Sequence, residues 1–384
     1  MKLLVISHGL GAVDKQSFYA ELEQQTGWTV TLTLPLRWKA QFGPIDMAQR
    51  WPGLRADIRH VDVISPGSLQ RHLYRSWWVG LLREIAPDVI YLQQEPYSLA
   101  TAQIYLANQL AGHRPIGFAT AQNVPRRSPA LTRALERWVL DHSDFAFPAT
   151  EGALSQLRAK HYTGSAEVLP RPVDPAIYRP EPAWSASRRA IMGFAPDCVV
   201  FGYMGRLIEE KGLHTLLSAF EQMDGPRWEL FLVGDGPLEG VLRSRVAASL
   251  RLRGHVHLAG VVPPAEAHCW LSLCDVVVLP SETRDRWREP SGRVLLEALA
   301  SGTPVVGSDS GETPGILRAT GGGLLFSEGD VAALAAALRR MATEPALRQQ
   351  LAAAGAAAVA EQYAQPALVR RFATALEAAA TAPR

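Results

Sequence analysis

Short apolar segments alternate with longer segments of helical period along this chain, and such alternation is typical of parallel α/β sheets. In the first half we expect strands at residues 2–7, 29–34, 88–92, 116–119 and 145–147. In the second half we expect strands at residues 199–204, 229–233, 256–258, 275–279 and 304–307. The alanine-rich segment 351–380 predicts a helix that is interrupted around Pro366. The fold class predicted by the sequence is therefore α/β.

The length of 384 residues exceeds what one ordinary core holds, and it fits two domains of roughly 150–190 residues each. Between the two groups of strands lies a stretch without amphipathic period that contains Pro170, Pro172, Pro175, Pro180 and Pro182. Proline-rich stretches of this kind mark linkers. We therefore expect a first domain over residues 1–180 and a second over residues 181–364.

The composition, 47% hydrophobic and 20% charged, is that of a globular protein rather than a disordered or membrane-spanning one. A net charge of +2 gives no global attraction to nucleic acid. Cys198, Cys269 and Cys274 are too few for a disulfide framework and lack metal-ligand spacing, which is typical of a reducing compartment. The opening segment MKLLVISHG is short for a signal peptide and predicts a buried strand. We therefore expect a cytoplasmic protein.

The segment 288–301, REPSGRVLLEALAS, predicts a loop that enters a helix, because Pro290, Ser291 and Gly292 precede an apolar helical face. Glu289 should lie in the loop and Glu297 about two turns inside the helix, which separates their carboxylates by roughly 10 Å. That distance suits a ligand laid across the helix N-terminus, where free N–H groups attract an anion. Taken alone, two glutamates are more typical of a solvated helix face.

A second segment, FGYMGRLIEEKG at residues 201–212, predicts a strand that ends in a glycine turn at Gly205. Arg206 and Lys211 follow that carboxyl end, which is the edge where ligands of open α/β sheets bind. Two fixed cations at this edge are suited to a diphosphate leaving group. Ordinary surface cations in a connecting loop are the alternative interpretation.

Together these segments resemble the retaining glycosyltransferases of family 4, which have the GT-B fold. The matching motifs in the second half are GRLIEEKG (205–212), VGDGP (233–237), HLAGVV (257–262), CDVVVLPSE (274–282) and EPSGRVLLEALASGTPVVGSDSG (289–311). In the first half PDVIYLQQEPYS (87–98), ATAQNVPRRSP (119–129) and VLPRPVDPAIYRP (168–180) are similar to the acceptor-side half of that family. The resemblance implies two Rossmann-like domains that face a central cleft. It also implies a final helix, 365–384, that packs back on the first domain.

The resemblance also implies roles for the candidate residues on the donor side. Glu297 should bind the ribose hydroxyls of a nucleotide sugar, and Glu289 should contact the donor sugar. Arg206 and Lys211 should stabilise the diphosphate, for which the sequence offers no Asp-x-Asp pair to hold a metal. The remaining candidates are backbone and helix-start positions for the donor, namely Gly205, Gly260, Val261, Ser291, Gly292 and Arg293.

The acceptor-side candidates are less regular than those on the donor side. Many relatives carry a histidine where this chain has Gln122, which can hydrogen-bond a sugar hydroxyl but takes no proton at neutral pH. Asn123 follows it, and a role for both amides in the protein core is the alternative. The other candidates are the glycine-bearing loop at His8, Gly9 and Gly11, the carboxylate Glu95, and Arg126 with Arg127 for a phosphorylated acceptor.

The segment 71–83, RHLYRSWWVGLLR, mixes arginines with Tyr74, Trp77 and Trp78. On a helix this mixture suits a lipid headgroup surface, which predicts contact with the inner face of the plasma membrane. A helix packed in the first domain is the alternative.

The sequence as a whole predicts a metal-independent retaining hexosyltransferase without a cofactor, involved in polysaccharide biosynthesis. It should move a sugar from a UDP- or GDP-linked donor to a hydroxyl of a glycan, lipid-linked or small-molecule acceptor, and it should not bind nucleic acid. The alternatives are a nucleotide-sugar 2-epimerase and a non-catalytic nucleotide-sugar-binding protein. Donor sugar, acceptor, linkage and oligomeric state are not specified by the sequence.

Overall fold

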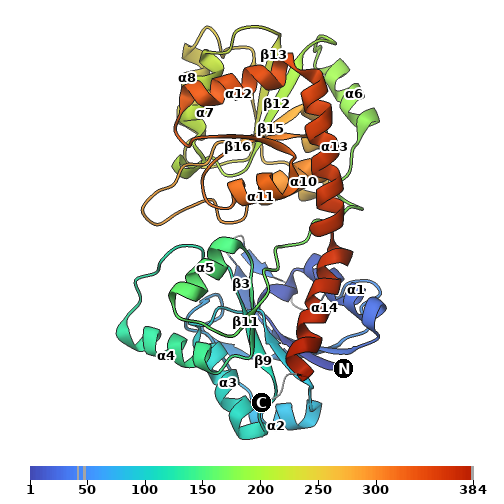
Figure 1. Cartoon of the computed structure of the whole chain (residues 1–384), viewed down its shortest axis with the longest axis vertical. Helices are drawn as coiled ribbons and strands as arrows, with labels where there is room; N and C mark the ends of the chain where they lie inside the picture. The colour runs from blue at the N-terminus through green and yellow to red at the C-terminus, as the bar shows by residue number, and fades with distance from the viewer. Residues whose placement is uncertain (41–42, 46–48, 382–384) are drawn as a thin grey trace. The chain divides into compact units, whose positions relative to one another are not determined.

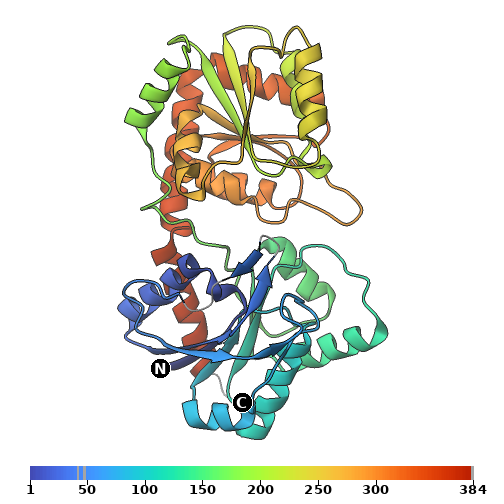
Figure 2. The same ribbon diagram turned by 180° about the vertical axis from the view of Figure 1, so that it is seen from behind.

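The computed structural model describes residues 1–40, 43–45 and 49–381. The chain forms two compact units (Figures 1 and 2). Unit 1 comprises Met1–Pro170 and Leu368–Arg384, and unit 2 comprises Arg171–Ala367. Each unit is a parallel α/β structure with its own sheet and core.

The sheet of unit 1 has seven parallel strands in the order β11-β10-β9-β8-β1-β2-β5. The strands are β1 (Lys2–Ile6), β2 (Thr29–Pro35), β5 (Asp57–Val61), β8 (Val89–Leu92), β9 (Ile116–Thr120), β10 (Phe145–Pro148) and β11 (Ser165–Ala166). The helices are α1 (Ser17–Thr26), α2 (Trp78–Ile85), α3 (Leu99–Ala111), α4 (Ala130–Asp141) and α5 (Glu151–Ala159). Two short antiparallel pairs accompany the sheet, β3 (Trp38–Ala40) with β4 (Gly43–Ile45) and β6 (Val63–Ile64) with β7 (Leu73–Tyr74).

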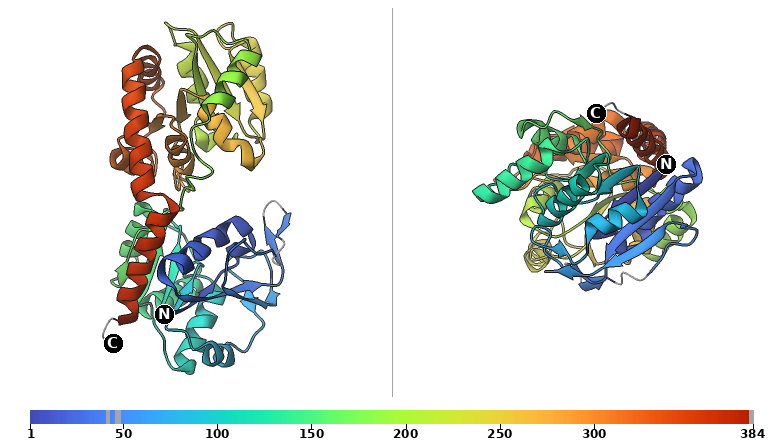
Figure 3. Two further views of the ribbon diagram at one scale, coloured as in Figure 1. Left: turned by 90° about the vertical axis from the view of Figure 1, so that its right-hand side faces the viewer. Right: turned by 90° about the horizontal axis from the view of Figure 1, so that it is seen from below.

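Both faces of this sheet are buried, because successive side chains of each strand point to opposite faces. On β1, Leu3 and Val5 join one apolar layer, whereas Leu4 and Ile6 join the other. The first layer is completed by α14 (Gln365–Thr381), which lies beside α1 (Figures 1 and 3). Its Phe372 is fully buried, with ring centroids 5.4 Å from Phe18 and 5.2 Å from Tyr91. The last helix of the chain is thus part of the core of unit 1.

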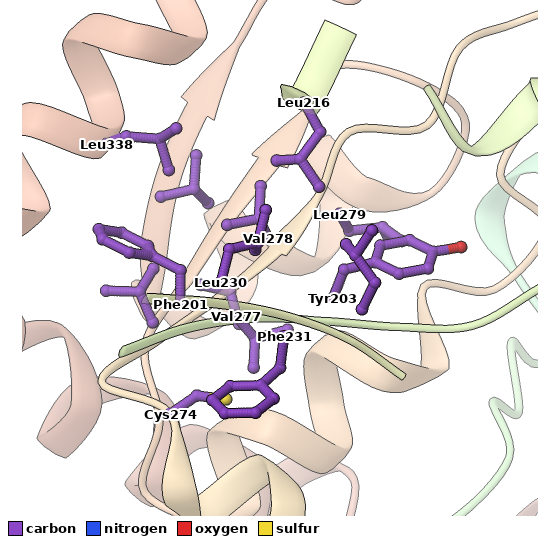
Figure 4. Close-up of a cluster of buried hydrophobic side chains, with 14 of the residues drawn as sticks. Phe201, Tyr203, Leu216, Leu230, Phe231, Cys274, Val277, Val278, Leu279 and Leu338 are labelled. Atoms are coloured by element: carbon purple, nitrogen blue, oxygen red, sulfur yellow. The ribbon is translucent and has the colours of Figure 1, made fainter. Parts of the chain in front are cut away.

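The sheet of unit 2 has six parallel strands in the order β14-β13-β12-β15-β16-β17. The strands are β12 (Val199–Met204), β13 (Trp228–Val233), β14 (Val256–Gly260), β15 (Val276–Leu279), β16 (Val305–Ser308) and β17 (Gly323–Phe326). The helices are α6 (Pro182–Ile191), α7 (Leu213–Glu221), α8 (Glu239–Ala248), α9 (Ala267–Leu273), α10 (Arg293–Ala300), α11 (Thr313–Thr320), α12 (Val331–Thr343) and α13 (Pro345–Gln362). Figure 4 shows Leu216 of α7 and Leu338 of α12 on one side of the strands, and Phe231 and Cys274 on the other.

Strand order reverses once in each unit. In unit 2, β13 and β14 lie on one side of β12, whereas β15, β16 and β17 lie on the other. In unit 1, β2 and β5 lie on one side of β1, whereas β8 and the strands after it lie on the other. Ligands of open α/β sheets bind outside the carboxyl ends of the two strands that flank such a reversal. These are the ends of β12 and β15 in unit 2, and of β1 and β8 in unit 1.

The α/β class and every strand predicted from the sequence are confirmed, with small differences at the strand ends. One interpretation was wrong: segment 71–83 is not a continuous helix, because Leu73–Tyr74 pairs as β7 with β6 and the helix begins only at Trp78. Trp78 is buried, whereas Trp77 is 76% exposed. Within the described residues, no helix is long and apolar enough to cross a membrane.

Candidate active site

The strand reversal of unit 2 carries a buried ion pair. Lys211 follows β12, and its Nζ lies 2.7 Å from Oε2 of Glu289, with side-chain exposures of only 16% and 5%. Ser281, two positions after β15, donates a hydrogen bond of 2.6 Å to the same carboxylate oxygen. The Lys211 ammonium also lies 5.2 Å from the centre of the Trp287 ring. The structure therefore brings together Lys211 and Glu289, which are far apart in the sequence.

Two glycines allow the segments that carry this pair to approach their neighbours. Gly212 adopts φ +63°, and a Cβ there would meet the carbonyl oxygen of Pro280 at 1.9 Å. Gly311 adopts φ +54°, and a Cβ there would meet the carbonyl oxygen of Glu289 at 2.2 Å. Only glycine tolerates both the positive φ and the close contact. Both glycines belong to motifs that the sequence singled out, but their structural reason was not visible there.

Glu297 lies on α10 and has two polar partners. Arg293 Nε donates to its Oε1 at 2.6 Å across one helical turn. The Tyr178 hydroxyl lies near this carboxylate, and burial followed by the Glu297 charge raises the pKa of Tyr178. Because α10 begins at Arg293, Glu297 is only one turn inside the helix, and the predicted two turns were wrong. Tyr178 was missed, since nothing in the sequence links it to Glu297.

The start of α10 leaves room for a ligand to approach the backbone closely. Gly292 is the N-cap residue in the left-handed conformation, at φ 51° and ψ 26°, and no side chain caps the helix. The first N–H groups of α10, after Ser291 and Gly292, therefore have no side-chain acceptor at this end. An anion placed here would meet N–H groups of the first turn and the positive end of the helix dipole.

The other donor-side candidates lie around the same strand ends. Gly205 follows β12, and its N–H donates to the Val233 carbonyl at 3.0 Å. Arg206 is exposed, and its side chain forms no hydrogen bond or ion pair within the described part of the chain. Gly260 ends β14 at φ +72°, and Val261 after it is 68% exposed. Arg206 and Val261 are thus accessible to a ligand.

Glu95 and Gln122 of unit 1 are engaged in internal hydrogen bonds. Glu95 accepts from Thr120 Oγ1 at 2.6 Å and from the Ala121 N–H at 2.9 Å, and burial raises the pKa of this carboxyl group. Gln122 donates to the Val124 carbonyl at 3.1 Å and accepts from Lys160 Nζ at 2.9 Å. Both side chains therefore hold the ends of β8 and β9 and the loop after them.

The remaining acceptor-side candidates differ in availability. Asn123 is partly exposed and has no side-chain partner among the described residues. The Arg126 guanidinium lies 4.2 Å from the centre of the Tyr97 ring and donates to Gln70 at 2.8 Å, so it is held in place. Gly11 is buried at the end of a short 3-10 turn, Gly9–Gly11, rather than in an open loop.

Across residues 1–40, 43–45 and 49–381, no group of three His, Cys, Asp or Glu side chains is placed to hold a metal ion. The cationic groups at the reversal of unit 2 are Lys211, Arg206 and the N-terminus of α10. These groups can bind an anion such as a diphosphate.

Comparison with known proteins connects this geometry to a family. Residues 187–358, which lie within unit 2, match the family model of glycosyl transferases group 1. The 2-deoxystreptamine glucosyltransferase of Streptomyces kanamyceticus is 28% identical over 79% of this chain and 71% of its own length. The lipopolysaccharide core biosynthesis glycosyltransferase LpsE of Rhizobium meliloti (strain 1021) is 32% identical over 48% of this chain. That match spans about half of LpsE, 51% of its length.

Solved structures resemble the whole chain. Sucrose-phosphate synthase from Thermosynechococcus elongatus superposes with a TM-score of 0.72 at 19% identity, covering 98% of both chains. Anabaena Alr3699/HepE in complex with UDP superposes with a TM-score of 0.73 at 18% identity, covering 98% of this chain and 100% of the other. The fold is therefore GT-B, as the sequence predicted. Unit 2 carries the region that matches the group 1 glycosyl transferases.

Proposed function

We propose that this chain is a retaining, metal-independent glycosyltransferase of family 4. It transfers a hexose from a UDP- or GDP-linked donor to a hydroxyl of a glycan, lipid-linked or small-molecule acceptor. The observation that carries the proposal is the buried Lys211–Glu289 pair at the strand reversal of unit 2. The match of residues 187–358 and the likeness to a UDP-bound structure support a nucleotide-sugar donor.

In this proposal unit 2 binds the donor and unit 1 the acceptor. Glu297, held by Arg293 and Tyr178, accepts hydrogen bonds from the ribose hydroxyls. Glu289 keeps one carboxylate oxygen on Lys211 and Ser281, and its other oxygen accepts from a hydroxyl of the donor sugar. The backbone at Gly260 and Val261 lies against the base. Carboxylates suit these positions because sugar hydroxyls are donors.

The reaction breaks the bond between the anomeric carbon and the diphosphate oxygen. The acceptor hydroxyl attacks the same face of the sugar, and its proton passes to the departing phosphate oxygen. Negative charge therefore grows on the diphosphate as the bond breaks. Lys211, Arg206 and the α10 N-terminus offset that charge, and they do so most strongly in the transition state. This distribution of cationic groups is why we propose turnover without a divalent ion.

The test of the donor site is a thermal-shift panel of UDP-, GDP-, ADP- and dTDP-sugars with EDTA present. A ligand at a hundred times its dissociation constant stabilises the folded state by about 2.7 kcal/mol. One nucleotide class should stabilise the protein. Glu297→Ala should weaken donor binding about ten- to a hundredfold, since a hydrogen bond to a charged group contributes about 1.5–3 kcal/mol. Unchanged affinity in the folded variant would remove Glu297 from the site.

Turnover assays separate the proposal from its alternatives. A transferase releases the nucleoside diphosphate only as an acceptor is glycosylated, and NMR of the product should show the donor's anomeric configuration. A 2-epimerase would release UDP and an altered sugar without an acceptor. A non-catalytic binder would show donor binding without turnover. Complete loss of activity in EDTA, restored by manganese, would refute the metal-free proposal.

A cytoplasmic location and contact with the inner face of the membrane stay predictions. Trp77 is exposed, and so is Arg75 two positions before it, although Arg75 is also paired with Asp62 at 3.8 Å; an exposed aromatic ring and an arginine suit lipid headgroups. Vesicles with anionic lipid at low salt should retain the protein, and Trp77→Ser should release it. Failure of the unaltered chain to bind such vesicles would refute membrane contact.

A further inference from the structure

A buried serine hydroxyl contacts the charged pair at the strand reversal of unit 2. Ser281 follows β15, one of the two strands that flank the reversal, and its side chain is fully buried. Its hydroxyl donates to Glu289 Oε2 at 2.6 Å. The residue lies within the motif at positions 274–282, but the sequence assigned it no role. Because a buried hydroxyl is out of reach of a ligand, Ser281 can influence one only through Glu289.

The two oxygen atoms of the Glu289 carboxylate have different surroundings. Oε2 accepts from both Ser281 and Lys211, at 2.6 and 2.7 Å. A carboxylate oxygen has about two acceptor positions, so these two donors fill Oε2. Oε1 has no hydrogen-bond partner among the described residues, and it is not one of the buried polar atoms that lack a partner. Oε1 is therefore the oxygen that a ligand can reach.

Ser281 and Lys211 differ in how firmly they hold the direction of this carboxylate. The lysine ammonium is a point charge on a flexible stem, so it attracts a carboxylate without fixing its orientation. The serine hydroxyl is carried by a short side chain with few rotamers, next to the end of a strand. A hydrogen bond to a charged group is also stronger inside a protein than in water. The hydroxyl is therefore the partner that sets the direction of the carboxylate.

The backbone at both ends of this hydrogen bond is held by β16 and the loop after it. Ser308 of β16 is fully buried, and its hydroxyl donates to the Ser281 carbonyl. The Glu289 carbonyl accepts from the Glu312 N–H at 3.1 Å. Gly311 approaches the same carbonyl so closely that a Cβ there would meet its oxygen. Ser281 and Glu289 are therefore fixed relative to each other by more than their own contact.

The hydrogen bond also closes a loop of the chain. Residues 282–288 fold back as a small hairpin, in which Arg284 and Trp287 exchange backbone hydrogen bonds of 2.9 and 3.1 Å. The hairpin returns the chain to Glu289, whose carboxylate then meets the Ser281 hydroxyl. The contact therefore constrains a side chain that follows a hairpin, where the neighbouring sequence alone would leave its direction open.

We propose that Ser281 is a positioning residue of the donor site. Its hydroxyl holds the Glu289 carboxylate so that Oε1 accepts a hydrogen bond from the donor sugar. The direction of the carboxylate matters, because a displacement of about 1 Å in an active site can cost roughly a hundredfold in rate. The inference rests on the proposed function, in which Glu289 contacts that sugar. It concerns the sugar and not the nucleoside diphosphate.

Calorimetry on the full-length protein tests the inference by comparing nucleotide sugars with the free diphosphates. The probes are UDP-glucose, UDP-galactose, UDP-N-acetylglucosamine and GDP-mannose, each beside UDP or GDP. Ser281→Ala should weaken the nucleotide sugar that the unaltered chain binds by about five- to thirtyfold, as expected for the loss of a hydrogen bond to a charged group. The free diphosphate has no sugar to reach Oε1 and should keep its affinity. Removing a serine that only stabilises the fold would weaken both ligands alike.

A double-mutant cycle tests whether the effect depends on the carboxylate. Glu289→Ala removes the partner of Ser281 and should weaken the nucleotide sugar at least as much as Ser281→Ala does. The double variant should bind no more weakly than Glu289→Ala alone, because the hydroxyl then has no carboxylate to position. Additive losses would refute the positioning role. If the alanine variant does not fold, Ser281→Cys takes its place, since its S–H is a weaker donor and should give a smaller loss of the same kind.

Thr320→Val is the matched control. It removes a buried hydroxyl of unit 2 at the last residue of α11, where the bonds are to the Ile316 carbonyl and the Gly322 N–H. It should change neither affinity. If the unaltered chain binds none of the probes, the proposed function is refuted and the inference fails with it. If it binds a nucleotide sugar that Ser281→Ala binds equally well, or if this variant loses nucleotide sugar and free diphosphate alike, only the inference is refuted.

Discussion

The two strand reversals have the same topology and opposite chemistry. At the reversal of unit 2 the functional groups are charged and paired, with Lys211 on Glu289 and Arg293 on Glu297. At the reversal of unit 1 the histidines are neutral, although the exposed Lys15 lies nearby, and His8 Nδ1 and Ser98 Oγ have no partner among the described residues. A charged group must find a partner before the ligand arrives, because an unpaired buried charge is too costly. A neutral polar group can stay unpaired until its ligand binds, because the free-energy cost is far smaller.

The largest expected effect comes from breaking the charged pair. Lys211→Ala leaves the Glu289 carboxylate buried without its cation, which should lower the free energy of unfolding by about 3–5 kcal/mol. Urea unfolding should show that loss, and the double variant Lys211→Ala with Glu289→Gln should recover most of it. Turnover should stay low in both variants. If donor affinity and turnover fall equally in Lys211→Ala, the lysine only binds substrate and does not act on developing charge.

The free energy of unfolding should depend on pH through His8 and His72 of unit 1. The pKa of His8 falls from 6.5 in the unfolded chain to about 4 in the fold, so below pH 6.5 the unfolded chain binds a proton that the folded chain does not. The free energy of unfolding should therefore decrease as pH falls from 6.5 towards 4, by roughly 3 kcal/mol at most. His72 adds to the decrease with the same sign, and His8→Phe should remove the part due to His8. Urea unfolding at several pH values measures it, and an equal slope in His8→Phe would contradict the assignment.

A smaller effect on donor affinity is expected from Tyr178, a neutral side chain beside the charged Glu297. Tyr178→Phe removes a hydroxyl that interacts with the Glu297 carboxylate, which Arg293 then holds alone. Donor affinity measured by calorimetry should fall about three- to thirtyfold, which corresponds to the ~1–2 kcal/mol of such a hydrogen bond. Tyr97→Phe in unit 1 is the control. An unchanged affinity would mean that Tyr178 only fills space beside α10.

The smallest effect should come from the aromatic contact of Lys211. Trp287→Leu removes the ring face under the ammonium and should lower turnover about two- to fivefold, as expected for a contact of ~0.5–1 kcal/mol. Trp287→Phe keeps a ring face and should retain most of the activity. If both variants lose the same activity, the loss is due to the packing of the Arg284–Trp287 bridge. The contact between the Lys211 ammonium and the ring would then not contribute to turnover.

The difference between the two edges also explains what the sequence could predict. Glu289 and Lys211 were recognisable because charged residues next to glycine turns and strand ends are local patterns. The β12 limits, Val199–Met204, are those expected, because its apolar run is short and bounded by Gly205. The strand Asp57–Val61 was missed, because its sequence, DIRHV, has too little apolar character to stand out.

The arrangement at the strand reversal of unit 1 could not be predicted from the sequence, because it depends on contacts between distant segments. The sequence offered His8 only as part of a glycine-bearing loop, and its ring contacts with Trp38 and His72 come from distant segments. Gln122 was expected to face a sugar, but Lys160, which holds its side chain, lies 38 positions away. Hydrogen-bond partners at such separations follow from the packing of whole elements, which no local pattern contains.

The position of α14 sets an order for folding during synthesis. The core of unit 1 needs Phe372, so the first 170 residues must wait, with Phe18 and Tyr91 still lacking that neighbour, while the ribosome makes all of unit 2. At 5–20 residues per second that interval is roughly 10 to 40 s. A nascent chain of this protein therefore exposes an unfinished apolar surface on its earlier half, and chaperones would be expected to bind there rather than on the half made later.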